Sequence, residues 1–178
     1  MSQDGKARAV ARSDEGAVFR APGHDHGRCV AEALGRAESV SVRRGARLTA
    51  LRRRVLELVW TSHAPIGAYD ILERLRRAGR RAAPIAVYRA LAFLMELGLV
   101  HRLASVNAYL GCGGPTAGHA GQFLICERCG SVAELSDRRI DRAIAAGAAR
   151  TGFKVVSPLV EVRGRCPGCR AREDGDDG

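Results

Sequence analysis

The chain is short of lysine, of aromatic residues and of long apolar runs. Only Lys6 and Lys154 among its 178 residues are lysine, so arginine supplies nearly all of the positive charge. Aromatic residues make up 4%, and the cores must therefore be built from leucine, valine, isoleucine and alanine. No apolar run approaches the roughly 20 residues that a helix needs to cross a bilayer, so we expect no contact with a membrane. The hydrophobic content of 46% is enough for one large or two small domains.

A secretory signal is also lacking, because residues 1–22 are polar and charged and contain no apolar core segment. We therefore expect a cytoplasmic protein, in which reduced cysteines are available for metal rather than for disulfides. Residues 1–22 show no hydrophobic period and are predicted to be a disordered N-terminal tail. Residues 171–178 are predicted to be an acidic tail.

Positive charge is concentrated in one stretch of the chain. The net charge is +10 overall, and residues 42–102 hold 13 arginines against four acidic residues, a local net of +9. A concentrated basic region is typical of a nucleic-acid-binding domain. The alternative is a solvated surface in a protein from an arginine-rich proteome. Charge alone leaves both interpretations open.

The hydrophobic period predicts a winged helix-turn-helix domain over residues 23–110. Four helices are indicated, at residues 25–41, from the N-cap Thr49 to about Ser62, at 68–78, and from Pro84 to Gly98. The period then changes to that of strands, and residues 100–103 and 108–110 flank a turn, which predicts a β-hairpin. Helices followed by such a hairpin place the last helix in the major groove of DNA.

A glycine-rich break at residues 111–121 is predicted to be a hinge between two domains. Beyond it we expect a small α/β domain over residues 122–170, so that the whole chain is α+β. Its expected elements are strands at 123–125 and 132–135, a helix at 137–149, and a second hairpin formed by 153–156 and 159–162 across Ser157-Pro158.

Two Cys-x-x-Cys knuckles are the strongest chemical signal in the sequence. Four thiolates in two such pairs form a closed tetrahedral cage of the kind that holds structural zinc. A redox dithiol is the alternative, but that motif is usually single. The 36 residues between the knuckles predict that the metal clamps the two ends of a subdomain. The predicted ligands are Cys126, Cys129, Cys166 and Cys169.

A second metal site is predicted around the hinge. Its predicted donors are His101 on the wing, Cys112 and His119 on the linker, and Glu134 on the strand after the first knuckle. This set of nitrogen, sulfur and oxygen donors suits tetrahedral zinc, and the thiolate disfavours Mn²⁺ and Mg²⁺. Metal there would fix the angle between the domains and could switch DNA affinity. The alternative is that these are ordinary surface or packing residues, as we expect for Cys29.

The fourth helix carries the candidate DNA-reading residues. Val87 and Leu91 face the core, so Tyr88 and Arg89 must point elsewhere. Arginine near a helix N-terminus can pair with guanine edges, and tyrosine can contact a thymine methyl or a phosphate. Phosphate contacts are expected from Arg47, Arg52, Arg53 and Arg54. The alternative is a half-buried tyrosine beside solvated arginines.

Together these motifs resemble the ferric uptake regulator family, and most of all its zinc uptake regulator branch. The resemblance covers residues 25–170 and rests, besides the knuckles, on Arg47-Leu48-Thr49, Ala68-Tyr69-Asp70-Ile71-Leu72, Val87-Tyr88-Arg89-Ala90-Leu91 and Leu97-Gly98-Leu99-Val100-His101. It implies a cytosolic homodimer that represses zinc-uptake genes by binding palindromic operators when loaded with zinc. It also implies two zinc ions per chain, one structural and one regulatory, in the two ligand sets above.

The same resemblance assigns roles to individual residues. Tyr88 and Arg89 match the base-contacting pair of the family. Tyr69, in the second motif, is also expected to contact DNA. Glu73 and Arg76 are positioned for salt bridges between two dimers on one operator.

Some features depart from the family pattern. Ala50 stands where proline is usual, and Ala86 where serine or threonine is frequent. The iron branch has a histidine-rich stretch before its first knuckle, whereas residues 113–121 contain only His119. Zinc is therefore the predicted effector, and an iron or other metal sensor of the same family is the alternative. An enzyme is not expected, because four protein ligands leave the metal no open position for water.

Overall fold

The computed structural model describes residues 26–62, 64–80, 82–113 and 121–173. Several predicted features lie outside these ranges: the N-terminal tail at 1–22, His119 with most of the hinge, and the last five residues of the acidic tail. The first three residues of that expected tail, 171–173, belong to a helix. No helix among the described residues is long and apolar enough to cross a membrane.

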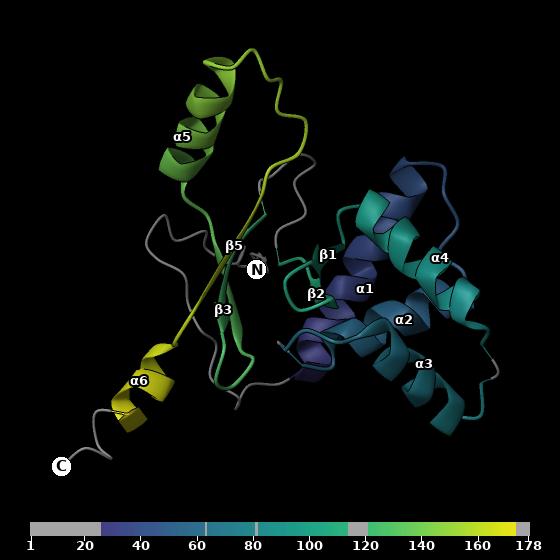
Figure 1. The fold of residues 1–178 in the computed structure, drawn as a ribbon. Coiled ribbons are helices and arrows are strands. Elements are labelled where there is room, and N and C mark those ends of the chain that lie inside the picture. The colour runs from purple at the N-terminus through teal and green to yellow at the C-terminus, as the bar shows by residue number, and fades with distance from the viewer. Residues whose placement is uncertain (1–25, 63, 81, 114–120, 174–178) are drawn as a thin grey trace, which may run out of the picture.

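The N-terminal half is a winged helix. Its elements are α1 (His26–Arg43), α2 (Ala50–Trp60), α3 (Ala68–Arg77), α4 (Pro84–Glu96), β1 (Val100–Leu103) and β2 (Ala108–Gly111) (Figure 1). The predicted start signals are confirmed, because Thr49 Oγ1 accepts a hydrogen bond from Arg52 N–H at 3.3 Å and Pro84 occupies the first turn of α4. Gly79 and Gly98 follow α3 and α4 with φ of +72° and +69°, a conformation that favours glycine.

The core of this half is aliphatic, as the composition requires. Fully buried leucine, valine and isoleucine side chains of the four helices fill it, among them Leu56, Ile71, Leu75 and Leu91. The loop before α3 joins the wing through Ile66, whose N–H and C=O both pair with Tyr109 at 2.9 Å. Trp60, 8% exposed, packs against the backbone of Gly111, and a Cβ at Gly111 would lie 2.3 Å from the Trp60 ring.

The C-terminal half, described over residues 121–173, contains a three-stranded sheet and two helices. The elements are β3 (Gly121–Cys126), β4 (Val132–Leu135), α5 (Arg138–Ala149), β5 (Leu159–Gly164) and α6 (Pro167–Glu173). The strand order is β4-β3-β5, with β4 antiparallel and β5 parallel to β3. Figure 1 shows α5 projecting from one end of this sheet and α6 lying at the other.

The predicted second hairpin is wrong. Residues 153–156 form no strand, and β5 pairs in parallel with β3 instead. The physical reason lies at the end of α5, where Gly152 turns with φ +72° and Phe153 N–H bonds to Ala148 C=O. The chain then returns along the length of the sheet, as a parallel connection requires. Helix α6 was not predicted from the sequence either.

A buried glutamine anchors α5 to the sheet. Gln122 is 1% exposed, and its Nε2 donates to Asp137 C=O at 3.0 Å and to the Asp141 carboxylate at 2.7 Å. Its Oε1 accepts from Asp137 N–H at 3.2 Å. Asp137 in turn caps the helix by accepting from Arg139 N–H. These bonds fix the start of α5, although no residue of α5 is itself fully buried.

Candidate metal centres and nucleic-acid interface

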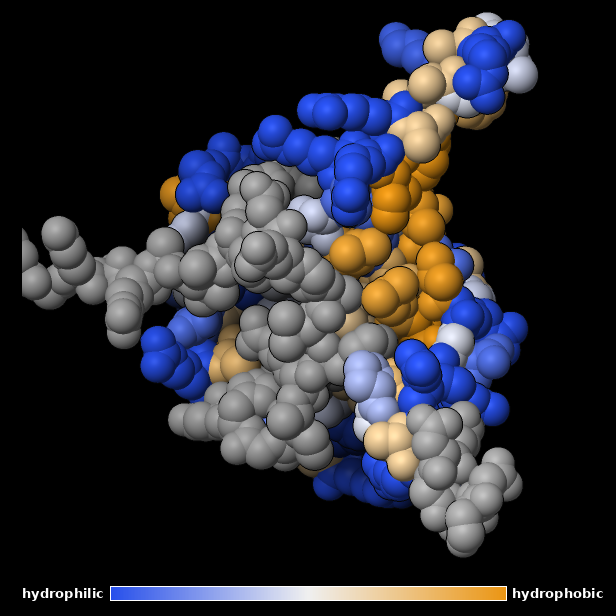
Figure 2. Space-filling model, turned by 90° about the vertical axis from the view of Figure 1, so that its left-hand side faces the viewer, coloured by the Kyte–Doolittle hydropathy of each residue, from blue (hydrophilic) through white to orange (hydrophobic). Residues whose placement is uncertain are grey.

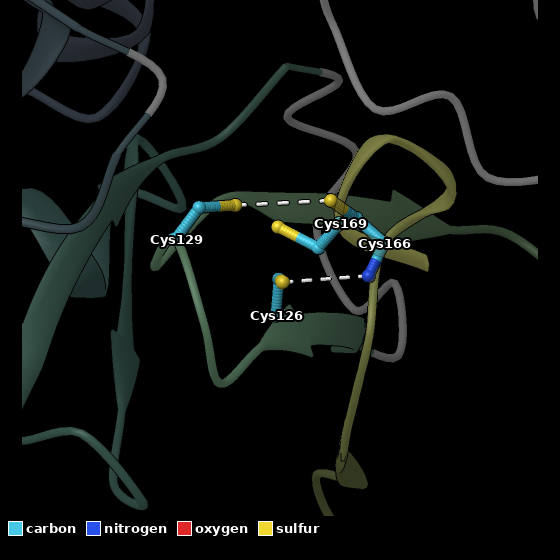
Figure 3. A group of neighbouring side chains, drawn as sticks. All are labelled: Cys126, Cys129, Cys166 and Cys169. Atoms are coloured by element: carbon cyan, nitrogen blue, oxygen red, sulfur yellow. Dashed lines mark hydrogen bonds between the residues drawn. The ribbon is translucent and has the colours of Figure 1, made fainter. Parts of the chain in front are cut away.

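The four knuckle cysteines meet in space, as the sequence analysis predicted. Cys126 ends β3, and Cys129 lies in the turn to β4. Cys166 directly precedes α6 and Cys169 lies in its first turn, so that the parallel β3–β5 pairing brings the two knuckles together. Their four sulfur atoms all lie within 4.8 Å of one another. Figure 3 shows the side chains converging on one point. The Cys129 and Cys166 sulfurs are 3.7 Å apart, far beyond the bond length of about 2.05 Å in a disulfide.

Backbone amides and burial act on these thiols in opposite directions. The N–H of Cys166 donates to Cys126 Sγ at 3.3 Å, and this bond, with the amides of Cys129 and Arg128, lowers the pKa of Cys126 to about 6. The Ser131 side chain lowers the pKa of Cys129. Burial raises the pKa of Cys169 to about 12. A divalent cation would offset the cost of a buried thiolate, so the donor set fits zinc.

A second cluster joins the two halves of the chain. His101 lies on β1, Cys112 directly follows β2, and Glu134 lies on β4; their donor atoms are within 4.8 Å of one another. The β1–β2 register pairs His101 with Leu110, which places Cys112 just beyond the wing ladder. The structure therefore brings together three of the four residues predicted for the hinge site.

The sheet registers explain why Glu134 reaches the wing. Phe123 pairs with Glu134 on β4, and its ring packs edge-on against the His101 ring at a centroid distance of 5.0 Å. Phe123 and Cys112 are each 1% exposed, so this junction is packed. An imidazole, a thiol and a carboxylate in this setting fit zinc, and the sulfur donor disfavours Mg²⁺ and Mn²⁺.

The candidate base-reading residues are exposed. Val87 and Leu91 are buried on one face of α4, while Tyr88 is 42% exposed and Arg89 lies on the outward face beside it. Tyr69, in the first turn of α3, is 74% exposed. Tyr69 and Tyr88 line one groove of about 550 Å³, which is closed on its other side by the wing turn and by residues of the C-terminal half that include Glu127 and Arg163. The two tyrosines thus lie in the N-terminal parts of α3 and α4, with part of each side chain exposed.

The arginines predicted to contact phosphate differ in their surroundings. Arg47 is exposed before α2. Arg52 lies with its guanidinium 3.5 Å from the centre of the Phe93 ring and donates to Arg47 C=O at 2.5 Å. Arg53 forms an ion pair with Glu38 of α1. Arg52 and Arg53 therefore also join α2 to its neighbouring helices, which the sequence analysis did not predict.

The two residues predicted to link dimers are both exposed on α3. Glu73 forms an ion pair with Arg77 at 2.5 Å within the same helix, one residue beyond the predicted Arg76. An exposed pair of this kind contributes little to stability and can exchange partners.

One contact between the two halves of the chain was not predicted from the sequence. The Glu161 carboxylate, on β5, accepts from Ala104 N–H at 2.7 Å and from Ser105 N–H at 2.9 Å, at the tip of the wing. The only signal in the sequence is a single acidic residue inside an otherwise apolar strand, Leu159-Val160-Glu161-Val162.

The chain is similar to several known proteins. A sequence profile described as the ferric uptake regulator family matches residues 43–163. The zinc uptake regulation protein of Escherichia coli is 39% identical over 141 residues, covering 78% of this chain and 81% of that protein. The zinc uptake regulation protein of Mycobacterium tuberculosis is 31% identical over 130 residues, covering 71% and 97%.

Two solved structures are also similar. One is a zinc uptake regulator complexed with zinc and DNA, with a TM-score of 0.76 and 38% identity over 82% of this chain and 97% of that chain. The other is a structure of holo XcZur, with a TM-score of 0.73 and 42% identity over 79% of this chain and 98% of that chain.

Proposed function

The chain belongs to the ferric uptake regulator family and is a metal-responsive transcriptional regulator rather than an enzyme, and from this premise we propose that it is a zinc-dependent repressor of zinc-uptake genes. As a zinc-loaded homodimer in the cytoplasm it binds palindromic operator DNA. The observation that carries the proposal is the cluster of His101, Cys112 and Glu134, which has one donor from the wing, one from the linker and one from the C-terminal sheet.

This cluster supplies the switch. Its donors come from both sides of the hinge, so occupancy stabilises only the arrangement in which they meet. The buried thiol of Cys112 favours zinc over harder cations, and His119 is proposed as the fourth ligand. An iron or other metal sensor of the same family is the second candidate. The similarity to zinc uptake regulators in sequence and in structure favours zinc.

The four knuckle cysteines are proposed to hold a second, structural zinc. They tie the end of β3 to the start of α6, and a closed four-sulfur cage has no open coordination position. The count is thus two zinc ions per chain. Because ligands from distant parts of the chain converge here, binding contributes directly to the folding free energy of the C-terminal half.

Dimerisation is proposed to use the open side of the C-terminal sheet. β5 is an edge strand that carries exposed apolar side chains, Leu159 at 49% and Val162 at 50%, and the segment leading into it carries Phe153 at 68% and Val156 at 91%. Figure 2 shows apolar surface gathered below the projecting end of α5. An edge strand with exposed apolar side chains on it and beside it is a site for pairing with a second copy.

DNA recognition is proposed to use the exposed ends of α3 and α4. Tyr88 and Arg89 contact bases and Tyr69 contacts DNA beside them, since all three side chains are exposed. Arg47, with Arg52 and Arg53 behind it, contacts phosphates and gives affinity without sequence preference. Where two dimers share one operator, Glu73 and Arg76 are placed on the exposed face of α3 to join them.

The experiment is operator binding measured against buffered free zinc. Fluorescence anisotropy would use a duplex from upstream of a zinc-importer gene, with the wild type, Cys112→Ala and Cys29→Ala. We expect binding to appear over a narrow range of very low free zinc in the wild type and in Cys29→Ala, and Cys112→Ala to stay unresponsive while keeping its fold and one zinc per chain. A normal zinc response in Cys112→Ala, or a stronger response to ferrous iron in the wild type, would overturn the proposal.

A further inference from the structure

The contact between Glu161 and the wing joins the two halves of the chain without using a metal donor. Both carboxylate oxygens are used, one for Ala104 N–H at 2.7 Å and one for Ser105 N–H at 2.9 Å. These are consecutive amides of the wing turn, which also contains Asn107 with φ +47° and an Asn107 N–H to Ala104 C=O bond of 3.2 Å. Consecutive turn amides form a small concave site for an anion, and a carboxylate fits it in a forked geometry.

The surroundings keep this carboxylate charged. Burial by itself would raise the pKa of Glu161, but the hydrogen bonds from Ser105 and Ala104 outweigh it and hold the pKa below its usual range. Hydrogen bonds made to an ionised acceptor are roughly twice as strong as those between neutral groups. Glu161 therefore binds the wing turn in the form present at neutral pH.

The register of the sheet connects this contact with the hinge cluster. Phe123 on β3 pairs with Glu134 on β4 and with Glu161 on β5, so the three residues form one row across the sheet. Paired residues in a row point to the same face. All three meet the wing: Glu134 in the metal-donor cluster, Phe123 against the His101 ring, and Glu161 at the turn.

We propose that Glu161 is a positioning residue that latches the wing to the C-terminal sheet and favours the same domain arrangement as the hinge metal site. The inference rests on the proposed function for its effect on DNA binding. Two contacts that stabilise one arrangement support each other by linkage, so the latch lowers the zinc concentration at which the protein binds its operator. The row of Glu134, Phe123 and Glu161 thus sets the zinc threshold as well as the geometry.

The test compares Glu161→Ala and Glu161→Gln with Glu96→Gln. The alanine variant removes both acceptors, whereas glutamine keeps one carbonyl acceptor and loses the charge. Glu96→Gln is the control, because it removes one exposed negative charge from the end of α4. Each protein carries its structural zinc, and its dimer mass and thermal midpoint are checked first. Should the alanine variant fail to fold, the glutamine variant decides the question.

Two readouts separate a latch from a general loss of structure. The first is the free zinc needed for half-maximal operator binding. The loss of charge-assisted hydrogen bonds at a partly exposed site is expected to raise this zinc concentration about tenfold in Glu161→Ala and about threefold in Glu161→Gln. Nearly full operator binding should return at saturating zinc. The second is hydrogen exchange of the amides of Ala104 and Ser105, measured in a Cys112→Ala background. Both amides should be protected with Glu161 present and exchange faster without it.

The outcomes distinguish the latch from the proposed function. If the wild type binds DNA without regard to zinc, the proposed function fails, and the exchange of Ala104 and Ser105 still decides whether the latch forms. If the wild type responds to zinc while Glu161→Ala matches Glu96→Gln in both zinc threshold and amide exchange, the latch is overturned. A reduced maximum at saturating zinc with an unchanged threshold would also contradict it, since that pattern indicates misfolding.

Discussion

The close approach of Trp60 to Gly111 predicts that a single methyl group will disturb the hinge site. In Gly111→Ala the new Cβ would lie 2.3, 2.5 and 2.8 Å from three atoms of the Trp60 ring. Ordinary carbon contacts need about 3.5 Å or more, so the backbone or the ring must shift by roughly 1 Å. The ring has little freedom to yield, because Trp60 is 8% exposed and the Arg36 guanidinium stacks over it at 5.2 Å.

The shift has two expected costs. Overpacking of this kind usually destabilises by about 1–3 kcal/mol. It also displaces the end of β2, and the next residue is Cys112, whose sulfur must hold its position within about 0.2 Å to bind metal well. We therefore expect Gly111→Ala to weaken zinc binding at the hinge site at least tenfold, while the four-cysteine site keeps its metal.

The assay uses a matched glycine two residues away. In Gly113→Ala the new Cβ meets the Glu134 carboxylate at an ordinary 3.8 Å, so little change is expected. Unfolding by denaturant would be followed by the circular dichroism of the helices, because Trp60 is the one tryptophan of the chain and one variant lacks it, and chelator competition would give the zinc affinity. The double variant Trp60→Phe/Gly111→Ala removes the clashing edge of the indole and should recover part of both losses. Equal stability and zinc affinity in Gly111→Ala and Gly113→Ala would refute this reasoning.

Three further predictions concern the cap of α5, the DNA face and the knuckles. Hydrogen bonds from the Arg139 side chain and N–H hold the pKa of Asp137 below its usual range, so this carboxylate stabilises the fold above pH about 4 and the contribution disappears at lower pH. Denaturant midpoints from pH 5 to 3 should therefore fall more steeply for the wild type than for Asp137→Asn, and parallel curves would contradict the cap. Arg89→Ala should cost about 1–3 kcal/mol in operator binding and relax the sequence preference at one base pair. Arg47→Ala should weaken binding to all DNA sequences alike and reduce the slope of log affinity against log salt concentration by about 1. Identical anisotropy profiles for the two variants would oppose these roles. Cys126→Ser should lose the structural zinc and weaken the dimer, and a sedimentation experiment showing a stable dimer would disprove it.

The helices of the winged domain could be predicted because their signals are local. The side chain of Thr49 caps α2 from the position that the sequence indicated, and Pro84 begins α4 as expected. The convergence of the four knuckle cysteines could also be predicted, since the chemistry of the motif requires it whatever path the chain takes. In both cases the prediction did not depend on how distant parts of the chain pack.

The C-terminal half was harder to predict because its pairing is not local. Three of the residues 153–156 are apolar, which is typical of a strand, and a tight turn at Ser157-Pro158 would have paired them with residues 159–162. In the structure, β5 pairs with β3 instead. No periodicity in the sequence distinguishes these two pairings. The same limit applies to Glu161. Its carboxylate accepts hydrogen bonds from amides more than fifty positions away, and only the tertiary fold brings these groups together.

The parallel pairing of β3 with β5 has a consequence for how the protein assembles. Gly121 pairs with Leu159, so this pairing must close a loop of 38 positions before any ladder bond forms. Loop closure of this length is an entropic barrier, and such non-local pairings fold slowly. The four thiols lie where the two strands end, at Cys126 and just beyond Gly164, and a metal captured there holds the strand ends together. The winged helix is built mostly from neighbouring segments, so we expect it to fold first and the sheet to mature at a rate set by zinc supply.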